Sequence, residues 1–256
     1  MELRIGTCGW SVKGGRKEYF KHFSVIELQS TFYRLPKEAT VIRWREEAPK
    51  DFEFTVKAWQ VLTHSPKSPT WKRANLKVKK EVLERLGWLK PTEENFRIWK
   101  DVLNICKVLR ARICIFQTPP SFGFSEENKK NVIEFFSSIE RDGLIIGWEP
   151  RGTWHEQVDQ LRTIFTQLDI VHVVDVLRRK PVLITEPMYF RLHGIGGREV
   201  NYRYKYTDSD LRKLLSICRE YLKDIREIYI MFNNMYMAED AMRLKELAKL
   251  KGLEVR

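Results

Sequence analysis

The chain has 256 residues, 43% hydrophobic and 31% charged, which is ordinary for a globular protein and excludes a disordered or collagen-like chain. No apolar run approaches the ~18 residues of a membrane span, and the start MELRIGTCGW lacks the basic-then-apolar order of a signal peptide, so we expect a cytoplasmic protein without membrane contact. The net charge is +12, which favours a polyanionic partner, nucleic acid first.

Eight short β-rich runs bounded by turn signals follow one another along the chain. The expected strands are Leu3–Gly9, Val25–Thr31, Phe52–Ala58, Arg112–Thr118, Leu144–Glu149, Ile170–Asp175, Met188–His193 and Glu227–Asn233. Segments with helical spacing separate most of them, namely Lys37–Glu47, Glu93–Leu109, Glu126–Ile139, His155–Leu168, Ser209–Lys223 and Ala238–Leu250. Ser11–Ser24 has room for only a short helix, and Val176–Pro187, with two prolines, predicts none.

This alternation forces parallel pairing through crossover connections. Eight strands in a chain of this length favour a closed barrel over an open, doubly wound sheet. We therefore expect an α/β protein with a single (β/α)8 TIM-barrel-like domain over residues 1–256, since no repeat, linker or low-complexity tract divides the chain.

A long basic insertion follows the third expected strand, at residues 60–91. Loops of that length are usually functional or mobile. With Trp59, Trp71 and Trp88 among its cations, it fits a stacking surface for nucleic acid, whose binding residues are predicted to be Lys72, Arg73, Lys77, Lys79 and Lys80. One alternative is a solvated helix whose tryptophans pack back onto the barrel. Another is that the basic surface reflects the thermophile-like composition of a heat-adapted protein.

Polar residues recur on one side of the expected strands. Side chains of a barrel strand alternate between the helix layer and the interior, so parity predicts which of them point inward. Most of the inward set lies near the carboxyl ends of the strands, where barrel enzymes keep their active sites. The predicted catalytic residues are Glu27, Lys57, Glu149, Asp175, His193 and Asn233.

The charges of this set bear on metal binding. Three carboxylates face Lys57, Arg151 and Arg191, which makes the site nearly neutral without a metal ion. A divalent-metal site would concentrate carboxylate and imidazole ligands, and the four cysteines form no CxxC pair. We expect no metal and no other cofactor, with a divalent metal as the alternative.

A glycine-rich turn, Gly194–Ile195–Gly196–Gly197–Arg198, follows the seventh expected strand. Loops after strands 7 and 8 of this barrel class frequently bind phosphate, because glycines let backbone N–H groups approach an anion. Arg191 and Arg203 add positive charge around it. The predicted substrate-binding residues are Gln29, Tyr33, His64, Gln117, Arg151, Arg191, Gly194, Gly196, Gly197 and Arg198.

Three residues receive specific roles. Glu149 beside Arg151 is expected to stay ionised and to act as a general base or to orient a water molecule. His193 is the expected proton donor, and Lys57 is expected to stabilise negative charge that develops in the transition state.

The strand-end motifs resemble those of one protein family. They are IGTCGWS at Ile5–Ser11, ELQSTFYRLP at Glu27–Pro36, FTVKA at Phe54–Ala58, FQTPPSF at Phe116–Phe122, WEPRGTW at Trp148–Trp154, YFRLHG at Tyr189–Gly194 and FNN at Phe232–Asn234. In this order, over almost the whole chain, they are similar to the domain-of-unknown-function 72 (YecE-like) family. The resemblance implies a TIM-barrel-like fold with a polar cleft, but no settled activity. Trp148–Arg151 reads WEPR where many relatives look more like FEFR, so the substrate entrance is expected to differ.

Three hypotheses for the function stay open. The first is a hydrolase on a phosphate-containing polyanion, most simply a nuclease on DNA or RNA. The second is a lyase, isomerase or hydrolase that acts on a sugar or sugar phosphate and uses the carboxylates as acid and base. The third is a nucleic-acid-binding protein without catalysis. The sequence does not decide between the first two, and it indicates no oligomeric state.

Overall fold

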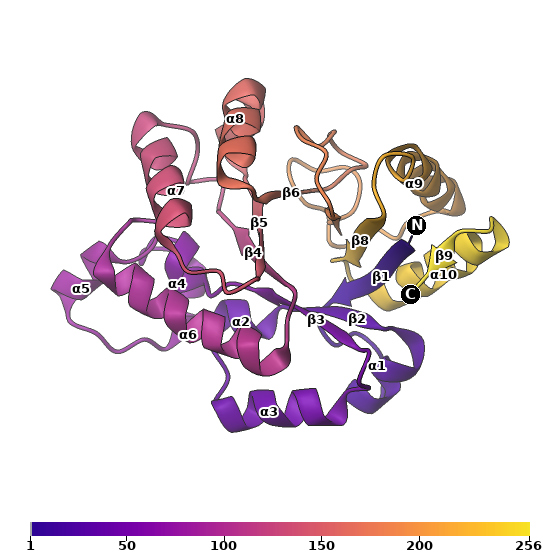
Figure 1. Ribbon diagram of the computed structural model, residues 1–256, viewed down its shortest axis with the longest axis horizontal. Coiled ribbons are helices and arrows are strands. Elements are labelled where there is room, and N and C mark those ends of the chain that lie inside the picture. The colour runs from indigo at the N-terminus through magenta and orange to yellow at the C-terminus, as the bar shows by residue number, and fades with distance from the viewer. Residues whose placement is uncertain (1) are drawn as a thin grey trace. The chain divides into compact units, whose positions relative to one another are not determined.

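Strands and helices alternate along the chain in the computed structural model, which describes residues 2–256 (Figure 1). The eight predicted strands are β1 (Glu2–Cys8), β2 (Val25–Leu28), β3 (Glu53–Lys57), β4 (Ile113–Gln117), β5 (Ile145–Glu149), β6 (Val171–Val174), β7 (Met188–Leu192) and β8 (Glu227–Phe232). A ninth, β9 (Glu254–Val255), escaped the sequence prediction. The strand order is β2-β3-β4-β5-β6-β7-β8-β1-β9, and β2 also pairs with β1. The sheet therefore closes into a barrel, as in the predicted TIM-barrel-like fold.

The longer helices are α1 (Arg16–His22), α3 (Glu38–Glu47), α6 (Glu93–Leu109), α7 (Glu126–Ser138), α8 (Val158–Leu168), α9 (Asp208–Tyr221) and α10 (Met237–Leu250). Six of them lie where the hydrophobic spacing predicts them, and α1 is the short helix for which residues 11–24 leave room. Thr92, Ser125 and Thr207 begin three of them, because each side chain accepts a hydrogen bond from the backbone N–H three residues later. Residues 176–187 contain no helix, as predicted. No helix within residues 2–256 is long and apolar enough to cross a membrane.

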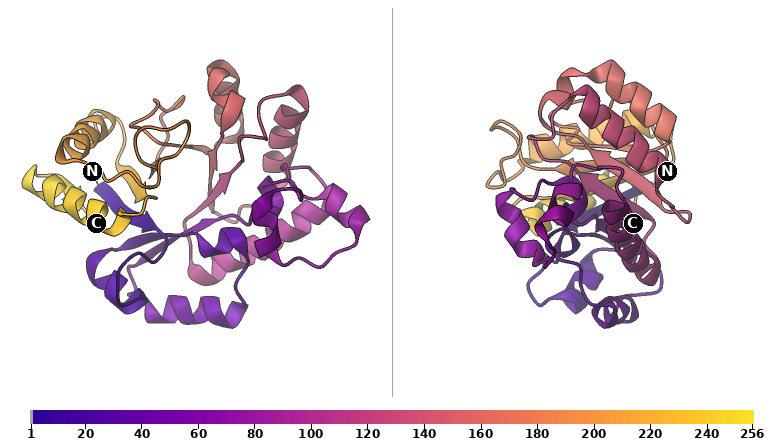
Figure 2. Two further views of the ribbon diagram at one scale, coloured as in Figure 1. Left: turned by 180° about the vertical axis from the view of Figure 1, so that it is seen from behind. Right: turned by 90° about the vertical axis from the view of Figure 1, so that its left-hand side faces the viewer.

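The chain divides into two compact parts, which are described separately below. The first part comprises residues 1–27, 47–54 and 171–256, and the second part comprises residues 28–46 and 55–170. The single domain over residues 1–256 stays a prediction. In the first part, β1 pairs with β8 from Glu2 to Thr7, with β2 at Thr7 and Cys8, and with β9 at Glu2 and Leu3. Helix α10 packs against β1, β8 and β9 (Figure 2).

A buried ion network fills the amino-terminal end of these strands. Arg4 of β1 binds the carboxylates of Glu227 and Glu53, the latter at 2.8 Å. Tyr229 of β8 donates its hydroxyl to Glu53 and stacks on Tyr189, with ring centroids 5.3 Å apart. Because each buried charge has a partner, this layer supports the packing of the strands at tolerable cost.

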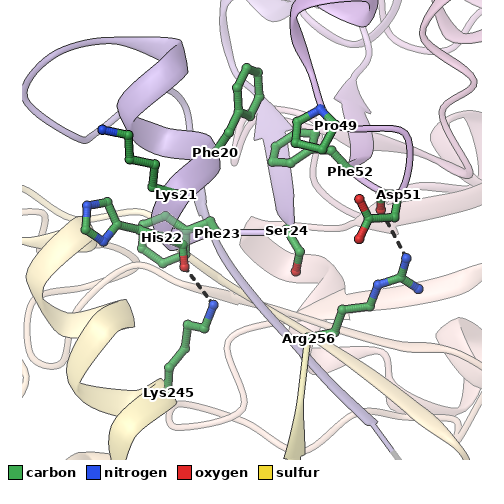
Figure 3. A pocket seen from close by; sticks show the side chains of 10 residues that line it. All are labelled: Phe20, Lys21, His22, Phe23, Ser24, Pro49, Asp51, Phe52, Lys245 and Arg256. Carbon is green, nitrogen blue, oxygen red and sulfur yellow. Dashed lines mark hydrogen bonds between the residues drawn. The ribbon is translucent and has the colours of Figure 1, made fainter.

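A pocket of about 240 Å³ lies beside the segments that precede β2 and β3 (Figure 3). Lys245 of α10 donates to the carbonyl oxygen of His22 at 2.7 Å, and Arg256 donates to the carbonyl oxygen of Asp51 at 3.1 Å. Burial lowers the pKa of the Lys245 amine. Residues at the amino-terminal ends of barrel strands serve stability more than catalysis, so the functional residues are expected at the carboxyl ends.

The insertion at residues 60–91 belongs to the second part and is helical. It contains α4 (Gln60–Thr63), the 3-10 helix η1 (Pro69–Ala74) and α5 (Lys80–Arg85). Trp59 and Trp71 are buried, and the Trp59 indole N–H donates to the carbonyl oxygen of Tyr33 at 3.2 Å. These two tryptophans therefore pack inward and offer no stacking surface. The five predicted nucleic-acid-binding cations are all exposed.

Candidate functional site

A buried charge pair joins β2 to β7 in the first part. Arg191 donates from Nε and Nη2 to the two carboxylate oxygens of Glu27, at 2.9 and 2.8 Å, and the Tyr189 hydroxyl donates to the same carboxylate at 3.0 Å. All three side chains are 0% exposed. This bidentate geometry satisfies both charges. It favours a positioning role for Glu27 and Arg191 over the direct catalytic and substrate contacts that the sequence predicts.

Asp175 lies just after β6 and anchors the backbone around it. Its carboxylate accepts the N–H of His193 at 2.9 Å and the N–H of Leu177 at 3.2 Å. The Arg178 guanidinium lies 3.5 Å away. A carboxylate that accepts several such contacts is held in its ionised form. Asp175 thus fixes the loop that begins at His193, and its catalytic role stays a prediction.

His193 and Asn233 meet at the ends of β7 and β8. The Asn233 amide nitrogen lies 3.1 Å from His193 Nδ1, and the imidazole is 3% exposed. Since the amide nitrogen can only donate, Nδ1 accepts and the ring proton of the neutral histidine resides on Nε2. In this neutral form the hydrogen-bond donor of the ring is Nε2. A full proton transfer requires the imidazolium, for which the Asn233 amide must turn and accept with its oxygen.

The glycine-rich loop follows directly after His193. Arg178 donates to the carbonyl oxygens of Gly194 and Gly196, from Nε at 2.8 Å to Gly194 and from Nη2 to both. In a trans peptide the C=O and the next N–H point in opposite directions, so the N–H groups of Ile195 and Gly197 point away from Arg178. Gly194, Gly196 and Gly197 have φ values of 82°, 79° and 72°, in the left-handed region that glycine tolerates.

The second part places Lys57 and Gln117 together at the ends of β3 and β4. Lys57 Nζ donates to the Gln117 side-chain oxygen at 2.9 Å and lies 4.0 Å from the centroid of the Phe32 ring. Lys57 is 5% exposed. A buried ammonium held by an amide oxygen and an aromatic face keeps a fixed position, which suits the predicted stabilisation of negative charge.

Glu149 and Arg151 form a second charge pair at the end of β5. Arg151 Nε and Nη2 both donate to one carboxylate oxygen, Oε1, at 2.9 and 2.6 Å. Both residues are largely buried. A carboxylate paired in this way stays ionised, as required of the predicted general base.

His64, from the basic insertion, lies near the same cations. Its Nδ1 is 2.8 Å from the Thr63 hydroxyl, and its ring packs edge-on against Phe32. Burial, together with the positive charges of Lys57 and Arg151, lowers the pKa of His64 from 6.5 to about 3. His64 is therefore neutral near pH 7, so it can bind substrate only through hydrogen bonds.

The remaining predicted residues lie as follows. Gln29 was placed on a strand by parity, which is wrong, because it adopts helical backbone angles at the start of the short helix α2 (Ser30–Tyr33). Tyr33 ends that helix and lies under the Arg73 guanidinium, 4.9 Å from it. Arg198 and Arg203 are exposed beside the glycine loop. Lys72, Lys77, Lys79 and Lys80 are exposed on the insertion.

Two residues with structural links to these sites were missed. Arg178 lies in the segment correctly predicted to lack a helix, where no periodicity identifies an inward side chain. Tyr202 lies after the glycine loop, is 44% exposed, and approaches the His193 ring to 6.1 Å between centroids. Within residues 2–256, no three His, Cys, Asp or Glu side chains are arranged to hold a metal ion.

Comparison with known proteins identifies the family. Residues 4–255 match the family described as "Protein of unknown function DUF72". The chain belongs to this family. The DUF72 chain is 23% identical to the UPF0759 protein YunF of Bacillus subtilis, over 98% of its own length and 95% of YunF. A segment of 48 residues, 19% of the chain, is 42% identical to the UPF0759 protein YecE of Escherichia coli, and covers 18% of that protein.

Solved structures of other DUF72 proteins share the fold. One from Thermotoga maritima superposes with a TM-score of 0.69 at 23% identity, covering 97% of this chain and all of that one. One from Enterococcus faecalis gives 0.71 at 18% identity, with 97% and 98% coverage. The fold also occurs in endonuclease IV from Thermus thermophilus, with a TM-score of 0.53 at 13% identity and 97% and 99% coverage. These similarities establish the TIM-barrel-like fold.

Proposed function

We propose that this DUF72 chain is a hydrolase that acts on a phosphate-containing polyanion, most simply a phosphodiesterase on nucleic acid. The glycine loop carries the proposal. Arg178 holds the carbonyl oxygens of Gly194 and Gly196 on one side, so the N–H groups of Ile195 and Gly197 are presented on the other. Backbone N–H groups presented on the same side of a loop form an anion-binding concavity.

The neighbouring histidine supplies chemistry suited to that anion. His193 directly precedes the loop, and its Nε2 carries the proton that the Asn233 contact keeps off Nδ1. A donor beside a bound phosphate stabilises the charge that develops on its oxygens. In the hydrolysis, water attacks phosphorus, the P–O bond breaks, and the leaving oxygen takes a proton from the imidazolium form of His193.

Residues of the second part receive the remaining roles. Glu149, kept ionised by Arg151, is the proposed general base that takes the proton of the attacking water. Lys57 provides a fixed positive charge. His64, neutral near pH 7, is proposed to bind substrate through a hydrogen bond.

Charge and fold support a nucleic-acid substrate. The net charge of +12 raises the affinity for any polyanion, and the exposed cations of the insertion provide contacts for phosphates. Endonuclease IV has the same fold, as does SacUVDE, with a TM-score of 0.59. Because Trp59 and Trp71 are buried, bases cannot stack on these two rings. The insertion is therefore proposed to bind nucleic acid by electrostatic contact.

A sugar or sugar phosphate is the second candidate substrate. A xylose isomerase domain protein from Salmonella typhimurium has the same fold, with a TM-score of 0.56, and the Glu149–Arg151 pair suits acid–base chemistry on hydroxyl groups as well. The two candidates differ in their dependence on the basic insertion. A small sugar phosphate needs only the glycine loop, whereas a nucleic acid would also contact the exposed lysines.

The experiment compares two glycine variants with similar backbone strain. Gly196→Ala adds a Cβ at a φ of 79° inside the loop, and Gly143→Ala adds one at a φ of 77° in a remote turn where a Cβ would meet nothing within 4 Å. Cleavage of labelled DNA and RNA and of bis-p-nitrophenyl phosphate is measured with EDTA and with Mn²⁺, Mg²⁺ or Zn²⁺. We expect activity that survives EDTA and is lost only in Gly196→Ala.

Equal activity of the two glycine variants would show that the glycine loop does not bind the substrate. Nucleic-acid binding without cleavage under any of these conditions would instead favour the hypothesis of a binding protein without catalysis. Turnover of sugar phosphates alone would favour the second candidate. Recovery of activity by a metal after chelation would show that a divalent ion takes part.

A further inference from the structure

A second cavity, of about 460 Å³, lies in the first part between the segment after β6 and helix α9. Its wall includes the apolar side chains of Val176, Leu177 and Ile217 and the ring of Tyr221. A volume of roughly 300–1,000 Å³ with an apolar lining is typical of pockets for small organic molecules. No residue predicted from the sequence as catalytic or substrate-binding lines this cavity.

The rim of the cavity is strongly cationic. It carries Arg178, Arg179, Lys180 and Lys213, against the carboxylate of Glu220. Glu220 is itself paired with Lys223 at 2.7 Å. Positive charge gathered around an apolar wall selects an anion that has an apolar body. Arg178 already lies 3.5 Å from Asp175, so the exposed Lys180 and Lys213 supply the charge that favours a dianionic phosphate ester over a singly charged carboxylate.

We propose that this cavity binds a small phosphate monoester with a flat apolar body, such as an aromatic phosphate. The body contacts Leu177, Ile217 and the ring of Tyr221, since aromatic faces favour stacked or edge-on contact with a second ring. The phosphate lies at the rim, where Lys180 and Lys213 are exposed and able to reach it. This site is separate from the glycine loop and does not rest on the proposed function.

Arg178 links the cavity to the glycine loop. Its Nε and Nη2 hold the loop carbonyl oxygens, and the same residue lines the cavity. A phosphate bound to this guanidinium would fix it and with it the conformation of the loop. The occupant of the cavity therefore strengthens anion binding at the loop, and by linkage an anion at the loop strengthens binding in the cavity. Only this coupling rests on the proposed function.

The test measures binding of phenyl phosphate to the full chain by calorimetry. The double variant Lys180→Gln/Lys213→Gln removes two rim charges, and Ile217→Trp fills the cavity. Arg212→Gln is the matched control, because Arg212 is an exposed cation next to Lys213 on α9 that does not line the cavity. Melting curves establish that all variants fold. Inorganic phosphate and benzoate serve as probes that lack the body or the second charge.

We expect the Kd for phenyl phosphate to rise at least tenfold in the double variant, to change less than twofold in Arg212→Gln, and to become unmeasurable in Ile217→Trp. Inorganic phosphate and benzoate should bind more weakly than phenyl phosphate. Unchanged affinity for phenyl phosphate in the double variant and in Ile217→Trp would show that this cavity is not its binding site. A chain that binds phenyl phosphate as expected but cleaves no phosphodiester would contradict the proposed function and leave this site standing.

The coupling has its own measurement. Saturation with phenyl phosphate should tighten binding of inorganic phosphate at the loop several-fold in the wild-type chain. Arg178→Lys keeps the charge but cannot hold two carbonyl oxygens and the cavity phosphate together, so the tightening should disappear. Tightening of equal size in Arg178→Lys would overturn the link through this residue.

Discussion

Arg191 binds both carboxylate oxygens of Glu27 across 164 residues of sequence, and neither side chain has any exposed surface. Removing one partner leaves the other charge buried and unbalanced, which typically costs about 3–5 kcal/mol. We therefore expect Glu27→Gln and Arg191→Met each to lower the free energy of unfolding by about that amount, measured by urea denaturation. The double variant should lose less than the sum, because it leaves no buried charge.

An exposed pair provides the control for this measurement. Glu220 and Lys223 lie 2.7 Å apart with more than half of each side chain exposed. Glu220→Gln should cost less than about 1 kcal/mol, as for surface ion pairs in general. If Glu27→Gln cost no more than this control, the Glu27–Arg191 pair would not be holding the strands, and a direct functional role would be favoured again.

Glu149→Gln and His193→Asn test the proposed acid–base roles. Each variant removes a proton acceptor or donor while keeping a polar side chain of similar size. Turnover of the substrate cleaved by the wild-type chain should fall by about 10²-fold or more at a temperature where both variants are folded. Glu149→Gln should also lower the melting temperature moderately, because it leaves Arg151 without its buried partner. Full activity in both variants, or melting tens of degrees lower, would mean that these residues support the scaffold instead.

Asn233→Asp tests the state of the His193 ring. A carboxylate at 3.1 Å from Nδ1 would accept a proton there and favour the imidazolium, raising the pKa of His193 by about one unit or more. The limb of the pH–rate profile that reports His193 should move to higher pH by the same amount. Asn233→Leu removes the contact without adding charge and should not produce this upward shift. Identical pH–rate profiles for all three proteins would show that His193 takes no part in proton transfer.

The basic insertion predicts salt-sensitive binding of nucleic acid. Neutralising Lys72, Arg73, Lys79 and Lys80 together should weaken binding and lower the slope of log K against log salt by about 3–4 on duplex DNA. The control neutralises Lys130, Lys223, Lys249 and Lys251, which are equally exposed but lie elsewhere. An equal loss of affinity in both quadruple variants would mean that the insertion contributes only through the net charge and is not a specific binding surface.

His64 predicts an acid-dependent loss of stability. The folded state lowers its pKa from 6.5 to about 3, so between these values the unfolded chain binds the extra proton. The stability of the folded chain that is linked to this pKa shift is therefore fully present above pH 6.5 and is lost as the pH falls toward 3. Between pH 7 and pH 5 the loss is about 2 kcal/mol.

A His64→Gln variant should show a correspondingly flatter dependence of unfolding free energy on pH in that window. His22→Gln, changed at an exposed position, should keep the wild-type slope. A wild-type slope in His64→Gln would mean that the imidazole titrates alike in the folded and unfolded chain.

The strands and helices were predictable because their signals are local. Apolar runs, helical spacing and caps such as Thr92 act within a few residues. The exception is β2, which ends at Leu28 rather than at Thr31. The Thr31 hydroxyl donates to the carbonyl oxygens of Leu28 and Lys57, and such side-chain bonds compete with the ladder of a sheet.

The partners within the candidate site were not predictable in the same way. Parity indicates that Glu27 and Arg191 point inward, but not that they bind each other, because their contact is set by the registers of β7 on β8, β8 on β1 and β1 on β2. Arg178 and His64 lie in irregular segments, where side-chain direction depends on tertiary packing. The depressed pKa of His64 likewise arises from burial and from the charges of Lys57 and Arg151, which tertiary packing brings close to it.

The short strand β9 covers part of an edge that would otherwise be open. β2 pairs with β1 only at Thr7 and Cys8, whereas Glu254 and Val255 pair with Glu2 and Leu3. Without these two residues, the beginning of β1 would present unpaired backbone donors and acceptors, which can recruit a strand from another molecule. The last residues of the barrel thereby act against self-association, and a fusion that displaces them would favour aggregation more than loss of activity.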